Sequence, residues 1–540
     1  MTNYADFRDA PTAVLDEAHT GHIHGAFGKI LSHDTGRRHG WRARLTTLLA
    51  ILGPGLIVMV GDNDAGAFAT YGQAGQNYGT ALLWTLALLV PVLYVNQEMV
   101  LRLGAVTGVG HARLIFERFG RFWGAFSVID LFLLNALTLV TEFIGISLAL
   151  DYLGLDKTTG VLIAAVLVMG AASTGDFRRF ERFAMILVVG SLLLVPIYLI
   201  VHPSMAQMAH DFVVPQLPAG GKLSDVMLLI IGIVGTTIAP WQLFFQQSYV
   251  IDKRITPRFI AYERVDLWIG IALVVIGAAA IMGFTAAAFA GHAEFGQFSD
   301  AAGLAAGLEK YAGGAAGVMF AVALIDAALI GAAAVSLSTA YALGDVFSVR
   351  HSLHRGVKDA KAFYAAYAGL IGLAAALVLT PGMPLGLLTN AVQALAGVLL
   401  PSATVFLLLL CNDQAVLGPW RNGRAANLFT GAVIAALVIL SIVLTMSVLF
   451  PDQTDERAIV AILVGGAVAA VAAAAFSGAF GKAGAVGTSG REAWRMPPLG
   501  RLAPYVMSRS SKAWMAALRL YLLLAAGLVL AQIVALAVWG

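Results

Sequence analysis

Charged residues are scarce in this sequence: Asp, Glu, Lys and Arg make up 12% of the 540 residues, about half the share of a typical soluble domain. Hydrophobic residues make up 59%, and a soluble fold cannot cover so much apolar surface, which excludes an ordinary soluble or disordered protein. The single cysteine, Cys411, excludes an intrachain disulfide and a cysteine-based metal site. We find no glycine-rich phosphate loop and no nucleophile–base arrangement, so the sequence does not indicate an enzyme or a nucleic-acid-binding protein.

The sequence instead contains long apolar runs separated by short polar segments. Runs of about 20 residues cross a bilayer as helices, because only a helix satisfies its own backbone there. We therefore expect an all-α polytopic membrane protein whose main partner is the lipid bilayer. The expected spans are 46–70, 79–101, 122–150, 159–175, 183–201, 224–250, 265–291, 313–344, 361–380, 385–411, 425–449, 457–479 and 515–539.

The basic residues predict the orientation. If the N-terminus is cytoplasmic and the spans alternate, 30 of the 34 Lys and Arg residues fall on the inner side, and only Lys157, Lys222, Lys310 and Arg457 lie outside. This bias follows the positive-inside rule. Residues 1–45 then form a cytoplasmic segment that holds five of the eleven histidines. We favour a disordered polar tail there over a metal-sensing tail, because such tracts have only compositional support.

Two of the apolar runs are interrupted by residues that break membrane helices. The first contains residues 61–66 (GDNDAG), and the sixth contains Pro240, which cannot donate a backbone hydrogen bond. Paired interruptions in two successive sets of five spans predict a 5+5 inverted-repeat transporter with broken first and sixth helices. We expect the two inverted repeats to occupy 46–411. Residues 412–540 would add two or three accessory helices and a basic cytoplasmic loop at 480–513.

The break in the first run carries two carboxylates. A carboxylate in the bilayer centre normally has a cation, a partner or water. Asp64 is therefore the strongest candidate for a functional residue, whereas Asp62 could equally face a water-filled vestibule.

Several segments of the sequence resemble the NRAMP family of divalent-metal transporters. Residues 64–70 (DAGAFAT) resemble the family's Asp-Pro-Gly-Asn motif and the run that follows it. Residues 141–145 (TEFIG) are similar to its Ala-Glu-Phe-Leu-Gly segment, and residues 239–241 (APW) stand where the family has Met-Pro-His. The tenth run keeps a Gln eight residues before a Pro, at Gln393 and Pro401. The resemblance covers about residues 53–427 and implies transport of a divalent metal.

The resemblance also implies a ligand set. The family's ligand positions fall on Asp64, Ala67, Thr236 (through its carbonyl), Ala239 and Gln393, so the family's Asn and Met are both replaced by Ala. A thioether suits transition metals, whereas Mg²⁺ prefers oxygen and keeps several waters. This pattern is similar to the NRAMP-related magnesium transporter branch. We expect a partly hydrated ion to bind among the following residues, without a cofactor: Asp62, Asn63, Asp64, Ala67, Thr236, Ala239, Gln242 and Gln393.

The resemblance also bears on proton coupling. The family's sixth-span histidines fall on Trp241 and Gln246. The acid that the family has three residues before its third-span Glu falls on Leu139. Glu142 remains, with Glu98 and Asp130 as further intramembrane acids. Because a proton relay needs titratable groups along a path, we expect Mg²⁺ and Mn²⁺ import by alternating access without proton coupling. The resemblance further implies a bacterial cytoplasmic membrane, and a monomer is plausible.

Three alternatives stay open at this point. A proton-coupled Mn²⁺/Fe²⁺ symporter would match the main family, although the missing Met and His argue against it. A sodium-coupled importer of an organic solute would share the architecture, but Asp64 would repel a substrate carboxylate. A metal sensor that signals through the histidine-containing segment would need a cytoplasmic output domain, and the sequence shows none.

Overall fold

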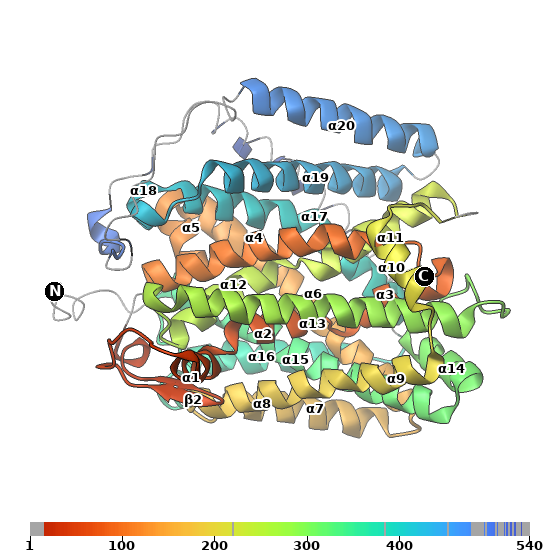
Figure 1. Cartoon of the computed structure of the whole chain (residues 1–540), viewed down its shortest axis with the longest axis horizontal. Coiled ribbons are helices and arrows are strands. Elements are labelled where there is room, and N and C mark those ends of the chain that lie inside the picture. The colour runs from red at the N-terminus through yellow and green to blue at the C-terminus, as the bar shows by residue number, and fades with distance from the viewer. Residues whose placement is uncertain are drawn as a thin grey trace.

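The computed structural model describes residues 16–218, 221–382, 385–450 and 453–476, together with parts of 491–531. Within these residues the protein is almost entirely helical, with one two-stranded hairpin. The long helices lie side by side along the longest axis of the molecule (Figure 1). Nine of the described helices are long and apolar enough to cross a membrane, and two bent pairs raise this number to eleven. The prediction of an all-α polytopic membrane protein is confirmed.

The first twelve predicted spans coincide with helices. The thirteenth, 515–539, and the basic loop 480–513 lie largely outside the described residues. The helices within the predicted spans are α1 Trp41–Ile51, α2 Pro54–Val60, α3 Ala65–Tyr78, α4 Trp84–Thr107, α6 Arg121–Tyr152, α7 Lys157–Ala172, α8 Phe177–Gly190, α9 Leu194–Val201, α11 Leu223–Thr237, α12 Pro240–Asp252, α13 Ile260–Phe289, α15 Gly314–Phe347, α16 Lys361–Val378, α17 Leu385–Asn412, α19 Arg424–Leu449 and α20 Glu456–Phe476.

Shorter elements mark the two ends of the bundle. The N-terminal hairpin, α5 (His111–Phe119) and α18 (Gln414–Leu417) lie at one end in Figure 1, and α10 (Met205–Val213) and α14 (Ala301–Ala312) lie at the other. We call the end with the N-terminal hairpin the inner end and the opposite one the outer end. The inverted relation between the two sets of five spans stays a prediction.

The first apolar run differs from the expected single span at 46–70. It is divided into α1 and α2, which are bent by 53°, and the run continues through α3 as far as Tyr78. The bend occurs at Leu52 and Gly53, directly before Pro54, which occupies the first position of α2. Asp266 of α13 accepts hydrogen bonds from the backbone of Gly53 at 3.1 Å and Gly55 at 2.7 Å. These bonds satisfy donors that a helix start leaves free, so the bend is fixed by a long-range contact.

The N-terminal segment is folded, and the expectation of a disordered tail is wrong for residues 16–39. It contains a short 3-10 helix (Glu17–His19) and the antiparallel strands β1 (Ile23–Gly25) and β2 (Gly28–Ile30). The centroid of the His22 ring lies 6.0 Å from that of His24 and 6.4 Å from that of His33. Among the described residues, no group of three or more His, Cys, Asp or Glu could hold a metal ion, so this segment gives no support to a metal sensor.

Candidate metal-ion site

The first break lies at residues 61–64, between α2 and α3. Asp64 caps the N-terminus of α3: its Oδ1 accepts a hydrogen bond from the Ala67 backbone N–H at 2.9 Å. Asp62 is fully buried and Asp64 is 3% exposed. The break between the two half-helices therefore holds two buried carboxyl groups. Asp64 also begins the second half-helix, because Asp is a strong N-cap.

The second break lies at Ile238 and Ala239, between α11 and α12. Pro240 occupies the first position of α12, which suits a residue without a backbone N–H. In a continuous helix the Thr236 carbonyl would accept a bond from residue 240, and proline cannot donate one. Pro240 thus leaves this carbonyl without the bond that a continuous helix would give it, and its role as a ligand stays a prediction.

Side chains join the two breaks directly. The Gln242 side-chain amide donates a hydrogen bond to Asp62 Oδ1, and Gln97 Nε2 of α4 donates one to Gln242 Oε1 at 2.8 Å. Tyr71 of α3 and Thr237 of α11 share a hydrogen bond of 2.7 Å. The structure thus brings Asp62 and Gln242 together, and their role as ligands stays a prediction. It also adds Gln97 and Tyr71, which no local sequence pattern identifies, because both act through contacts distant in sequence.

Glu142 of α6 stands beside the first break. Its Oε2 accepts a hydrogen bond from the Ala65 backbone N–H at 3.1 Å, and its carboxyl group contacts that of Asp64. Gly331 of α15 makes room for it, since a Cβ there would lie 2.8 Å from the Glu142 carboxyl group. Two buried carboxyl groups in contact are favourable only if they share a proton or a cation.

Several buried oxygens around the breaks have no hydrogen-bond partner among the described residues. They include Asp62 Oδ2, Asn63 Oδ1, Thr236 Oγ1 and Glu142 Oε1. An unpaired oxygen in a low-dielectric interior is unfavourable, so such atoms usually contact an ion or water. Oxygen atoms are the ligands that hard divalent cations prefer. The acids alone do not form a group that could hold a metal, among the residues described. An ion here would therefore also need neutral oxygens or water.

A cleft leads toward this region from the outer end. The cleft is lined near the first break by Ala65, which directly follows Asp64, and by Thr141, which directly precedes Glu142. Phe298 and Asp300, which precede α14, line its outer part. On the inner side of the breaks every residue of α2 and of α12 is buried. The cleft thus lies on the outer side of the breaks, and both half-helices on the inner side are buried.

The remaining predicted site residues divide into two groups. Ala67 is fully buried in the first turn of α3, and Ala239 is 7% exposed directly before α12, so both adjoin the breaks. Asn63 points away, because its amide donates a hydrogen bond to the Val274 carbonyl of α13 at 3.1 Å. Gln393 belongs to α17, but its side chain lies outside the described residues.

Two of the predicted intramembrane acids have partners of their own. Glu98 of α4 forms ion pairs with Arg102 at 3.0 Å and with Arg264 at 2.6 Å. Asp130 of α6 accepts a hydrogen bond from Ser402 of α17 at 3.0 Å. These contacts give Glu98 and Asp130 structural roles, and Glu142 alone of the three predicted acids adjoins the first break.

Comparison with known proteins finds similarity along most of the chain. The family model described as "Natural resistance-associated macrophage protein-like" (Nramp) matches residues 55–447. A divalent metal cation transporter MntH of Ralstonia nicotianae is 30% identical over 424 residues, covering 74% of this chain and 92% of that protein. The MntH of Burkholderia ambifaria is 27% identical over 418 residues, covering 74% and 90%.

A solved structure shares the fold. It is the Eremococcus coleocola manganese transporter in complex with an aromatic bis-isothiourea substituted compound. The TM-score is 0.62 at 21% identity, and the match covers 81% of this chain and 95% of that one.

Proposed function

The chain belongs to the Nramp family, and from that premise we propose that it is a divalent-metal transporter that carries Mg²⁺ as well as Mn²⁺, without proton coupling. Transport of divalent metal cations follows from the relatives. The preference for Mg²⁺, the lack of coupling and the alternating-access mechanism are our inferences. The observation that carries the preference for Mg²⁺ is the donor set at the two breaks, which consists of oxygen atoms.

Each break supplies oxygen ligands of a different kind. Asp62 and Asp64 provide carboxylates, Thr236 provides its backbone carbonyl, and Gln242 contacts Asp62 from the second break. Ala239 offers no thioether sulfur where the family carries methionine. A site of this composition favours hard cations, and Mg²⁺ retains water readily where the protein leaves room. We expect Gln393 to contribute its side-chain oxygen, and we leave Asn63 out because its amide is directed toward α13.

The direction of transport follows from the charge of the ion. An inside-negative potential favours entry of a divalent cation by about 4.6 kcal/mol per 100 mV. We place the protein in a bacterial cytoplasmic membrane with its N-terminus inside, in keeping with the distribution of Lys and Arg. Uptake would then need no coupling ion.

One observation favours a second candidate, a proton-coupled Mn²⁺/Fe²⁺ symporter. The contact between the Asp64 and Glu142 carboxyl groups can hold a proton. Against it, Trp241 and Gln246 replace groups that could pass a proton onward, and both are fully or almost fully buried. A proton held between Asp64 and Glu142 would then have no titratable group to pass to, so it would return to the side from which it came.

Flux measurements separate the two candidates. The protein is reconstituted in liposomes that contain a Mg²⁺ dye, and a parallel set contains a pH dye. We expect Mg²⁺ uptake without acidification of the lumen. Mn²⁺ uptake with acidification and without Mg²⁺ flux would replace our proposal with the symporter.

A further inference from the structure

Residues 16–39, which we call the N-terminal strap, fold over the inner end of the bundle (Figure 1). The hairpin lies so close to α1 that a Cβ on Gly25 would come within 2.0 Å of the Ala50 carbonyl oxygen. On the other side of the hairpin, the backbone N–H of Ala26 donates a hydrogen bond of 2.5 Å to Glu181 of α8. The strap therefore spans from the start of the first broken run to α8.

Glu181 extends this connection to both broken runs. It forms an ion pair of 2.5 Å with Lys253, and both side chains are fully buried. Lys253, directly after α12, also donates a hydrogen bond to the Leu52 carbonyl at the α1–α2 bend, at 2.9 Å. The strap, α8, the bend in the first run and the inner end of α12 thus share one buried ion pair.

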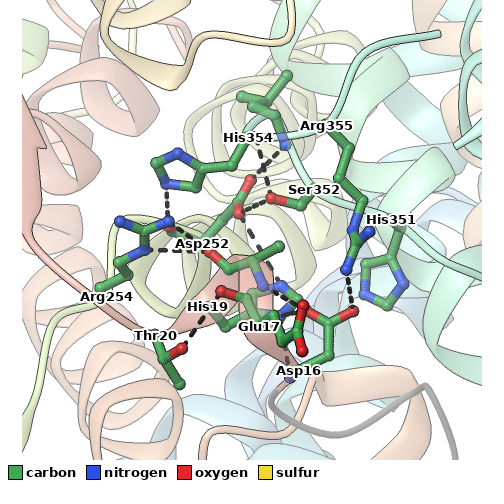
Figure 2. A network of polar contacts seen from close by, with 12 residues as sticks. Asp16, Glu17, His19, Thr20, Asp252, Arg254, His351, Ser352, His354 and Arg355 are labelled. Carbon is green, nitrogen blue, oxygen red and sulfur yellow. Dashed lines mark hydrogen bonds and ion pairs between the residues drawn. The ribbon is translucent and has the colours of Figure 1, made fainter. Parts of the chain in front are cut away.

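A second set of contacts ties the strap to α12 (Figure 2). The Arg254 guanidinium donates hydrogen bonds to the Ala18 carbonyl at 2.7 and 3.0 Å and to the His22 carbonyl at 2.8 Å. Arg254 adopts φ of 66°, a left-handed conformation that a side-chain-bearing residue rarely takes. These contacts hold an unfavourable backbone conformation directly beyond the inner end of the broken sixth run.

A third set of contacts ties the strap to the loop between α15 and α16. Asp16 forms an ion pair with Arg355 at 2.8 Å, and His19 lies 3.0 Å from Asp16 and 3.9 Å from Asp252 (Figure 2). Asp252 in turn accepts hydrogen bonds from Ser352 at 2.5 Å and from Tyr341 of α15 at 2.6 Å. The strap thus joins the end of α12 to elements outside the broken runs.

We propose that the N-terminal strap is an autoinhibitory latch that holds the inner side closed and must release before the inner ends of the broken runs can separate from α8 and α15. The inference rests on the proposed function, because alternating access requires that separation. The closed state is consistent with the complete burial of α2 and α12 and with the cleft at the outer end. Loosening the strap should therefore speed inward opening.

Flux and thiol labelling together test the latch. Arg254→Gln removes the charged donor that reaches two strap carbonyls. The matched control is Arg179→Gln, because Arg179 lies on α8, is 72% exposed and pairs only with the nearby Asp176 among described residues. Ala26→Cys adds a thiol probe to the strap, since Ala26 is 3% exposed and the native Cys411 is fully buried. Initial Mg²⁺ and Mn²⁺ influx and the rate at which the introduced thiol is alkylated from the inner side are measured in each background.

We expect Arg254→Gln to raise the initial influx at least threefold and to accelerate alkylation, while Arg179→Gln matches the parent in both. Asp16→Asn, whose side chain is 20% exposed, should act in the same direction more weakly and serves if Arg254→Gln does not fold. Faster alkylation with unchanged or reduced influx would overturn the latch. If the parent carries neither ion, the proposed function fails. Alkylation that is unaffected by either substitution would then still overturn the latch.

Discussion

Asp64→Asn isolates the charge of the first break from its structural role. Asp64 caps α3 by accepting a hydrogen bond from the Ala67 N–H at 2.9 Å, and Asn caps helices about as well as Asp. The substitution keeps shape and cap but removes one negative charge from a site in which Asp64 is 3% exposed. The fold should therefore survive, and any loss of transport reports on the ion.

The expected magnitude is large. Unit charges 4 Å apart near a protein surface interact by about 4 kcal/mol, so a divalent ion and a carboxylate interact by about 8 kcal/mol before desolvation is subtracted. If desolvation removes two thirds of this, about 2.7 kcal/mol remains, which corresponds to about a hundredfold change in affinity. We expect Asp64→Asn to abolish measurable Mg²⁺ influx at millimolar concentrations.

Influx into proteoliposomes and isothermal titration with Mg²⁺ provide the assay. The matched control is Asp130→Asn, the same substitution at an intramembrane acid whose partner is Ser402 rather than the breaks. It should retain both influx and binding, and the thermal unfolding temperature of Asp64→Asn should stay close to that of the wild type. If Asp64→Asn kept more than about a tenth of the influx, the ion would not bind at the first break.

Three further outcomes follow from the same contacts. Ala67→Asn combined with Ala239→Met should shift uptake from Mg²⁺ toward Mn²⁺ and Cd²⁺, because it restores a soft sulfur ligand, and unchanged selectivity in competition assays would contradict the donor-set argument. Glu98→Gln should lower the unfolding temperature while leaving the Mg²⁺ to Mn²⁺ ratio unchanged, because it breaks a partly buried ion-pair cluster. His351 lies outside the spans; burial opposes its charge, but the hydrogen bond and charge of Asp345 raise its pKa to about 9. A raised pKa stabilises the fold fully below about pH 6.5, the usual pKa of His, and this stabilisation is lost as the pH rises through 9. The free energy of unfolding should therefore fall by on the order of 3 kcal/mol over this range. His351→Gln should flatten the dependence of the unfolding temperature on pH in thermal melts.

The spans were predictable because hydropathy is a local property of the sequence. The two breaks were predictable as well, since Pro240 and the paired carboxylates at 62 and 64 stand out within apolar runs. The position of the first helix boundary was not, because the bend before Pro54 depends on hydrogen bonds to Asp266, more than 200 residues away. The residues next to Pro54 in the sequence do not indicate that Asp266 will be their partner.

The site was predictable in part, for the same reason. Asp62, Asp64 and Gln242 carry polar groups in apolar surroundings, which is a local signal, whereas the choice between ligand and structural roles depends on neighbours in space. Glu98 looks like Glu142 in the sequence, but only the structure shows its arginine partners. The N-terminal segment looks like a disordered tail for a related reason, because its contacts come from distant parts of the chain.

The distant contacts of the strap also order the events of synthesis. Its residues leave the ribosome before their partners, because the Arg254 and Arg355 contacts join residues 232 and 339 positions apart. At bacterial and eukaryotic elongation speeds the last of these partners emerges roughly 17–70 s later. During that interval the strap can reach its partners on α1 and α8 but not Arg355, so its docking is incomplete and it stays open to proteases. Docking of the strap would therefore mark a chain whose insertion has passed the loop after α15, and a chain that stalls earlier would expose its N-terminus to degradation.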